Sequence, residues 1–223
     1  MNQEQALSLL KETKLVAILR GIPVKQATDI ATALYDGGVH ALEFTFDHDD
    51  PDCVAHNCQR IRAVKKIFGD EMVVGCGTAL TVQEVEASVE AGGQIVISPN
   101  VDVSVIAKTK ALGAISMPGA LTPTEIVMAY NAGADIVKLF PAGTLGVPYI
   151  KAVRGPLGYI PMSAVGGVRP ETIADFLNVG VCGFGVGGEL VKKEFVRSGD
   201  MNALTSRARK FVHAIEQWEA NRS

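Results

Sequence analysis

The apolar stretch LVAIL at residues 15–19 is five residues long, and a second one, ALEFT, follows at residues 41–45. Runs of this length without regular polar alternation are typical of parallel strands that are buried on both faces. Between them, residues 24–38 (VKQATDIATALYDGG) carry apolar side chains at helical spacing and end in glycine, the residue preferred just after a helix. This stretch therefore predicts two parallel strands joined by a helix.

The same unit recurs along the rest of the chain. Six further apolar runs follow, at MVVGC (72–76), QIVIS (94–98), AISMP (114–118), DIVKLF (135–140), IPMSAV (160–165) and CGFGV (182–186). Capping-box spacings such as Thr81 with Glu84 and Thr122 with Glu125 mark helix starts between them. Eight such units predict a single (β/α)8 TIM barrel over residues 1–223, with an extra N-terminal helix across the barrel bottom and a C-terminal helix after Asp200. A doubly wound open sheet is the alternative, since it uses the same units with fewer strands.

The composition argues against several classes of protein. The chain is 48% hydrophobic and 20% charged, and its net charge of −3 lacks the basic surplus of a nucleic-acid binder. No apolar run is long enough to cross a membrane, and the N-terminus does not resemble a signal peptide. The four cysteines (Cys53, Cys58, Cys76 and Cys182) have no zinc-site spacing, so we expect free, mostly buried thiols in a cytoplasmic protein.

Two charged residues interrupt apolar strands, where burial of a charge is costly. Lys138 lies inside DIVKLF, and Glu43 lies inside ALEFT. A desolvated lysine loses its proton more readily, and the neutral amine attacks carbonyl groups to form an imine. A buried glutamate with a raised pKa carries protons in such a reaction. We predict both as catalytic, the alternative being a buried ion pair that serves only the structure.

Other candidate side chains follow the predicted strands, at the barrel end that carries the chemistry in this fold. Arg20 ends the first strand and is suited to holding a carboxylate in a bidentate fork, although rim arginines also form surface ion pairs. Thr78 follows Gly75, Cys76 and Gly77, small residues that let a ligand approach the backbone, and its hydroxyl can donate to that ligand. Pro99 and Phe140 are expected to form an apolar wall that keeps the lysine desolvated.

Two glycine pairs follow the last two strands. They are Gly166 and Gly167 in AVGGV, and Gly187 and Gly188 in GVGGEL. Many barrels bind phosphate here through exposed backbone N–H groups, so both pairs are predicted to bind phosphate. Tightly packed turns would require the same glycines and remain the alternative.

The acidic run of residues 47–50 offers one histidine, His48, as its only nitrogen ligand. Such runs usually cap turns and helices, so no metal is expected there. His56 and His213 lie in helical stretches and are expected to be structural or exposed.

Taken together, these segments resemble the 2-keto-3-deoxy-6-phosphogluconate (KDPG) and 4-hydroxy-2-oxoglutarate (KHG) aldolase family, from about Leu15 to about Val191. The matching segments are VAILRG, GGVHALEFTF, GCGTALT, ISPN, PGALTPTE, VKLFPAG, AVGGV and GVGGEL. The resemblance implies a (β/α)8 barrel, a class I lysine mechanism without metal or cofactor, and a homotrimer. It implies that Lys138 forms the Schiff base, Glu43 transfers protons and Thr78 contacts the pyruvate part, while the Gly-Gly turns bind phosphate.

One departure concerns the carboxylate. Many gluconate-type members place an arginine where this chain has Asp47, and an acid would repel a carboxylate. Galactonate-type members lack that arginine and use the one that ends the first strand, which is Arg20 here. The AVGG segment also resembles the galactonate type. We therefore expect Arg20 to bind the carboxylate.

The function predicted from the sequence is cleavage of a 2-keto-3-deoxy (phospho)sugar acid or 4-hydroxy-2-oxoglutarate. The products would be pyruvate and an aldehyde such as glyceraldehyde 3-phosphate or glyoxylate. The alternatives are a phosphosugar isomerase or epimerase that uses Glu43 as a base, and a non-catalytic phosphosugar-binding barrel. The expected partners are small molecules, with neither nucleic acid nor membrane among them.

Overall fold

A computed structural model of the chain describes residues 1–222. The strands are β1 (Leu15–Leu19), β2 (Ala41–Thr45), β3 (Val73–Gly77), β4 (Ile95–Ile97), β5 (Ile115–Met117), β6 (Gly119–Ala120), β7 (Val137–Leu139), β8 (Met162–Val165) and β9 (Gly183–Val186). They form one parallel sheet in the order β5-β4-β3-β2-β1-β9-β8-β7-β6. Since β1 pairs with both β2 and β9, the first and last strands meet and the sheet curls into a barrel.

The predicted strand of residues 114–118 ends at Met117, and a further short strand that was not predicted follows Pro118. The predicted strand, β5, pairs with β4, and the additional strand, β6, pairs with β7. Proline has no N–H to donate to a ladder, but its carbonyl still accepts from the Lys138 N–H at 2.9 Å. The nine strands therefore occupy the eight predicted barrel positions.

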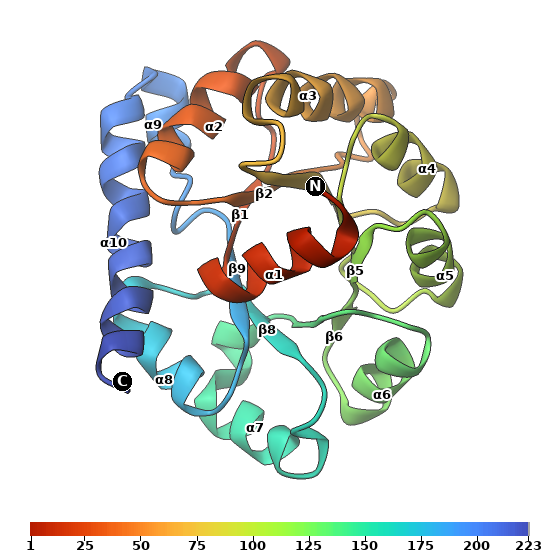
Figure 1. Cartoon of the computed structure of the whole chain (residues 1–223), viewed down its shortest axis with the longest axis vertical. Helices are drawn as coiled ribbons and strands as arrows, with labels where there is room; N and C mark the ends of the chain where they lie inside the picture. The colour runs from red at the N-terminus through yellow and green to blue at the C-terminus, as the bar shows by residue number, and fades with distance from the viewer. Residues whose placement is uncertain (223) are drawn as a thin grey trace.

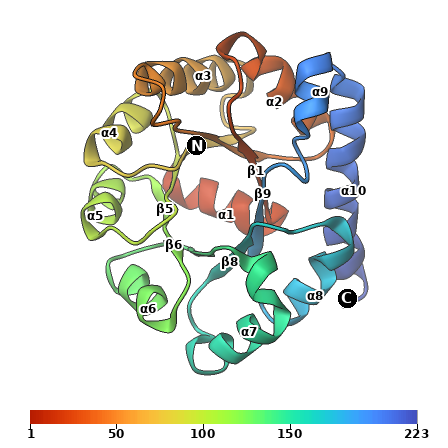
Figure 2. The ribbon, with the colours of Figure 1, turned by 180° about the vertical axis from the view of Figure 1, so that it is seen from behind.

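The helices surround the barrel in a ring (Figure 1). They are α1 (Gln3–Thr13), α2 (Ala27–Asp36), α3 (Cys53–Phe68), α4 (Val82–Glu90), α5 (Val103–Ala111), α6 (Pro123–Asn131), α7 (Ala142–Leu157), α8 (Ile173–Asn178), α9 (Lys193–Ser198) and α10 (Met201–Ala220), with short 3-10 turns at Val24–Gln26 and Pro170–Thr172. Helix α1 lies across one end of the barrel, and the opposite end faces the viewer in Figure 2. The predicted barrel with its two extra terminal helices is confirmed.

The predicted capping boxes form as expected. The Thr81 hydroxyl accepts from the Glu84 N–H at 3.2 Å, and the Thr122 hydroxyl accepts from the Glu125 N–H at 3.3 Å. All four cysteines are free, as predicted; Cys58 and Cys76 are buried, and the other two are half-buried. Within residues 1–222, no helix combines the length and apolarity needed to cross a bilayer.

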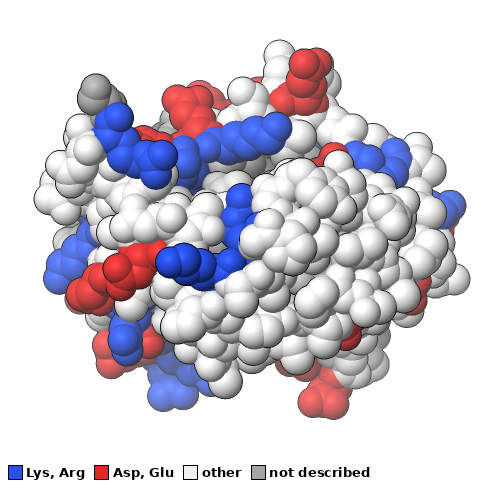
Figure 3. Space-filling model, turned by 90° about the horizontal axis from the view of Figure 1, so that it is seen from below, with Lys and Arg blue, Asp and Glu red and all other residues white. Residues whose placement is uncertain are grey.

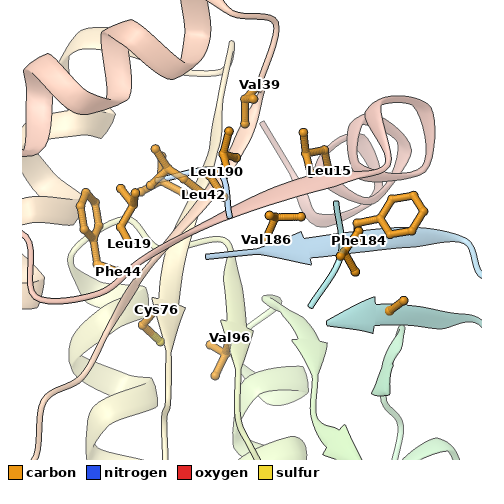
Figure 4. Packing of buried hydrophobic residues seen from close by; sticks show 14 of the residues in the cluster. Leu15, Leu19, Val39, Leu42, Phe44, Cys76, Val96, Phe184, Val186 and Leu190 are labelled. Carbon is orange, nitrogen blue, oxygen red and sulfur yellow. The ribbon is translucent and has the colours of Figure 1, made fainter. Parts of the chain in front are cut away.

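The core has two parts. The larger packs the outward faces of the strands against the helices, with Leu19, Leu42 and Phe44 side by side in Figure 4. The smaller fills the barrel interior with side chains such as Ala41 and Ile136, and α1 covers it. Since side chains alternate along a strand, residues two positions after Ala41 and Ile136 also face inward. Those residues are Glu43 and Lys138.

Candidate active site

A cavity of about 570 Å³ lies where the carboxyl ends of the strands meet. Every residue that the sequence predicts for the site lines it, namely Arg20, Glu43, Thr78, Pro99, Lys138, Phe140, Gly166, Gly167, Gly187 and Gly188. These residues follow or belong to seven different strands, so only the closed barrel brings them together. A concave site with convergent polar groups is the usual form of an enzyme active site.

Lys138 is the most deeply buried cation of this cavity, with 7% of its surface exposed. Burial lowers the pKa of its amine, the Glu43 charge opposes this shift, and the Arg20 charge adds to it. Its Nζ lies 5.1 Å from the centre of the Phe140 ring. Within residues 1–222, Nζ has no carboxylate within ion-pair distance, so the structural ion pair that the sequence left open is not formed.

Glu43 is 1% exposed and faces the same cavity from β2. Burial raises the pKa of its carboxyl to about 7, against the opposing charges of Lys138 and Arg20. Its Oε2 atom has no hydrogen-bond partner among the described residues. A carboxyl with a pKa near neutrality and an unpartnered oxygen is suited to taking and returning a proton.

Gly77 makes room for this carboxylate. A β-carbon added at Gly77 would lie 1.8 Å from Glu43 Oε2 and 2.4 Å from its carboxyl carbon. The sequence indicated that the glycines beside Cys76 let a ligand approach the backbone. In the structure Gly77 instead admits a side chain of the neighbouring strand, and this contact has no signal in the sequence.

Replacing Gly77 with alanine should therefore displace the Glu43 carboxylate. We expect a loss of about 1–3 kcal/mol in unfolding free energy, typical of overpacking, together with a fall in turnover. Thermal unfolding and steady-state assays measure both effects. Gly155→Ala is the matched control, because a β-carbon there has nothing within 4 Å. Normal turnover in Gly77→Ala would show that the carboxylate needs no fixed position.

Arg20 and Thr78 lie on the same cavity. Arg20 is exposed, has no ion-pair partner within residues 1–222, and shifts the pKa values of both Glu43 and Lys138 by its charge. Thr78 has a φ of +58°, a left-handed conformation that is costly for a β-branched residue. Such strained residues cluster at sites of function.

The two glycine turns form the part of the wall that follows β8 and β9. Gly166 and Gly167 have φ values of +90° and +72°, which only glycine adopts freely, and the Gly166 carbonyl accepts from the Gly143 N–H at 2.8 Å. Glu189, beside the second turn, also lines the cavity and was missed from the sequence. Its carboxylate lies 3.5 Å from Arg207 and 3.6 Å from Lys192.

The acidic run forms a capped turn. The Asp50 N–H donates to the Asp47 carbonyl at 2.9 Å, and the Asp49 N–H donates to the Asp47 carboxylate at 3.3 Å. His48 pairs with Glu84 at 2.7 Å, and His56 pairs with Asp50 at 2.8 Å. Asp47 lines two neighbouring grooves rather than the cavity that holds Lys138. The acid that departs from the gluconate pattern therefore lies beside the reacting centre and not within it.

Comparison with known proteins places this barrel among aldolases. The family model described as KDPG and KHG aldolase matches residues 7–207. The chain belongs to the KDPG and KHG aldolase family. This membership confirms the resemblance predicted from the sequence and makes the chain a carbon–carbon lyase of the class I aldolase type.

Within this aldolase family, relatives of the galactonate type are well represented. The probable 2-dehydro-3-deoxy-6-phosphogalactonate aldolase of Rhizobium meliloti (strain 1021) is 37% identical, over 81% of this chain and 83% of that protein. The 2-dehydro-3-deoxy-6-phosphogalactonate aldolase of Escherichia coli (strain K12) is 35% identical, over 80% and 84% of the two chains. The solved "Native KDPGal structure" has a TM-score of 0.83 and 33% identity, over 92% and 96%.

Proposed function

We propose that this aldolase cleaves a 2-keto-3-deoxy sugar acid of the 6-phosphogalactonate type into pyruvate and glyceraldehyde 3-phosphate, with Lys138 as the Schiff-base residue. The single observation that carries the proposal is the juxtaposition of Lys138 and Glu43, both buried and neither ion-paired, in one open cavity. The names of the two relatives that share more than a third of the aligned sequence support the galactonate type.

In this mechanism, the neutral amine of Lys138 attacks the C2 ketone of the substrate. Because the pKa of Glu43 is raised to about 7, its protonated and ionised forms are both present near neutral pH. The protonated form donates the proton that lets water leave, which completes the imine. Glu43 then removes the proton of the C4 hydroxyl, and the C3–C4 electron pair moves into the imine as the aldehyde departs. Protonation of the resulting enamine at C3 and hydrolysis of the imine release pyruvate and restore Lys138.

The remaining residues are assigned to substrate binding. Arg20 holds the carboxylate next to the ketone, and Thr78 hydrogen-bonds to the same part of the substrate. Phe140 and Pro99 form the wall that limits water around Lys138. The Gly166–Gly167 and Gly187–Gly188 turns offer backbone N–H groups to a terminal phosphate.

Replacing Arg20 with alanine should raise the KM for pyruvate in the aldol direction by about 10- to 100-fold, the equivalent of a lost charge-assisted hydrogen bond. Since Arg20 is exposed, the fold should be unaffected. Steady-state kinetics with varied pyruvate measure the change, and Arg62→Ala, another exposed arginine with no role here, serves as the control. An unchanged KM would mean that another group binds the carboxylate.

The function itself is tested by comparing substrates. Purified protein is given the 6-phosphogalactonate derivative, its C4 epimer of the gluconate type and 4-hydroxy-2-oxoglutarate, and pyruvate release is followed. We expect the fastest release from the galactonate derivative. Conversion of a phosphosugar without pyruvate release would favour the isomerase or epimerase, and binding without turnover would favour the non-catalytic barrel.

The proposal extends to assembly and location. Figure 3 views the molecule from the side where Figure 1 places α6 and α7, and charged side chains are sparse over much of this face. Met128 and Tyr130 of α6 and Tyr159 beyond α7 are all exposed. A face that is poor in charge and carries exposed apolar side chains supports a homotrimer, which sedimentation would reveal as three times the 23.6 kDa chain mass. The four free thiols support a reducing cytoplasm.

A further inference from the structure

The turn that follows β1 carries Arg20 and is held at few points. Gly21 has a φ of +65°, and a β-carbon added there would have nothing within 4 Å, so its surroundings do not restrict it. The Ile22 side chain is 3% exposed and packs in the core. A hollow of about 350 Å³ is lined by residues of both this turn and α3. One buried side chain anchors the turn, but it leaves the backbone beside Arg20 free to rotate.

Arg60 of α3 supplies a second fixed point. Its Nε–H donates to the Ile22 carbonyl at 2.8 Å. Among residues 1–222, this is the one side-chain hydrogen bond that reaches the backbone of residues 20–23. The donor is a charged guanidinium that is half-buried, and charged donors form stronger hydrogen bonds than neutral ones. Arg60 therefore fixes the direction of the peptide group two residues after Arg20.

Asn57, one turn earlier on α3, orients this guanidinium and connects it to β2. The Arg60 Nη1 group donates to Asn57 Oδ1 at 2.7 Å, and Asn57 Nδ2 donates to the Phe44 carbonyl at 3.1 Å. Asn57 is 1% exposed, so its amide depends on these two partners. Phe44 directly follows Glu43. A chain of three hydrogen bonds thus runs from the Arg20 turn through α3 to the strand that carries Glu43.

The ends of this chain separate it from an ordinary structural contact. In the proposed mechanism Arg20 holds the substrate carboxylate and Glu43 moves protons, so the two groups must keep a fixed relative position. Arg154 of α7 makes a similar pair of bonds, to the carbonyls of Ile160 at 3.3 Å and Gly158 at 3.0 Å. Those carbonyls precede β8, at the amino end of the strands, and neither residue lines the catalytic cavity.

We propose that Arg60, oriented by Asn57, is a positioning residue that fixes the Arg20 turn relative to β2 and so sets the place of the substrate carboxylate. The inference rests on the proposed function, in which Arg20 binds that carboxylate. Arg60 itself does not line the catalytic cavity, and it acts through Arg20. Its planar fork is essential, because one guanidinium donates to two oxygens in different directions.

The kinetic test uses the aldol direction with varied pyruvate. Arg60→Ala should raise the KM for pyruvate by about 3- to 10-fold, the equivalent of one hydrogen bond, and leave kcat nearly unchanged. Because Arg60 acts through Arg20, the double variant Arg20→Ala/Arg60→Ala should have the KM of Arg20→Ala alone. Arg60→Lys keeps the charge but lacks the fork, so its KM should also rise.

The matched control is Arg154→Ala, which removes a half-buried arginine that also donates to two carbonyls. It should lower the melting temperature about as much as Arg60→Ala does and leave the KM as in wild type. A wild-type KM in Arg60→Ala or Arg60→Lys would overturn the inference. So would effects of Arg20→Ala and Arg60→Ala that multiply in the double variant, or an equal rise in KM in Arg154→Ala.

Hydrogen–deuterium exchange tests the placement of the turn without any reaction. Peptides that cover residues 15–27 should exchange faster in Arg60→Ala than in wild type, and at the wild-type rate in Arg154→Ala. Faster exchange in a protein that forms no pyruvate adduct would count against the proposed function alone. Unchanged exchange in a protein that does form the adduct would overturn the positioning role and leave the proposed function intact.

Discussion

Replacing Lys138 with alanine should abolish cleavage, with a loss of at least about 10⁴-fold in kcat, because Lys138 is the only lysine among the described residues that line the cavity. The fold should survive, since the variant removes a buried cation that has no ion-pair partner within residues 1–222. A coupled assay of pyruvate release measures the loss, and circular dichroism verifies the fold.

A structural lysine provides the contrast. Lys110 lies 2.6 Å from the Asp135 carboxylate, just before β7. Lys110→Ala should lower stability slightly and leave kcat as in wild type. Substantial turnover by Lys138→Ala, or a loss of kcat in Lys110→Ala as large as that in Lys138→Ala, would contradict the role assigned to Lys138.

Replacing Glu43 with glutamine should slow turnover by about 10²- to 10⁴-fold, the usual loss when a general acid–base is removed. Cleavage requires Glu43 as a carboxylate to accept the C4 hydroxyl proton, and its pKa is raised to about 7. The kcat/KM of the wild type should therefore rise with pH through about 7. A pH–rate profile without an inflection near 7 in the wild type would argue against Glu43 as the base.

The same substitution should change how stability depends on pH. The folded protein holds the Glu43 proton up to a pH of about 7, against an ordinary value of 4.5, so the unfolding free energy of the wild type falls as pH rises between these values. This difference corresponds to about 3 kcal/mol, and the loss of the counter-charge at Lys138 offsets part of it in the variant. Denaturant unfolding should find Glu43→Gln more stable than wild type by about 1–3 kcal/mol at pH 8, and nearly equal to it at pH 4.5.

The fold was predictable because the signals are local and repeated. Each predicted strand begins and ends within two residues of its predicted bounds, and one short strand, β6, was not predicted. Pro118 ends the fifth strand and separates it from β6, since proline lacks the N–H that would continue the ladder. The run of residues 135–140 is shortened to Val137–Leu139 because Asp135 turns its carboxylate to the Ser116 N–H at 2.8 Å and to Lys110.

The grouping of the site residues was predictable for a similar reason. A lysine and a glutamate inside apolar strands have few stable arrangements, and parallel strands bring their carboxyl ends to one mouth of the barrel. Contacts between distant elements were not predictable. The packing of Gly77 against the Glu43 carboxylate depends on the register of β2 and β3.

The central claim is that Lys138 forms a covalent imine with a 2-keto acid, and reductive trapping tests it most directly. The protein is incubated with pyruvate and sodium borohydride, its intact mass is measured, and the modified peptide is mapped. We expect one reduced pyruvate adduct per chain, located on Lys138, and none in Lys138→Ala. A folded wild-type protein that gains no adduct, under conditions in which another class I aldolase is trapped, would contradict the account.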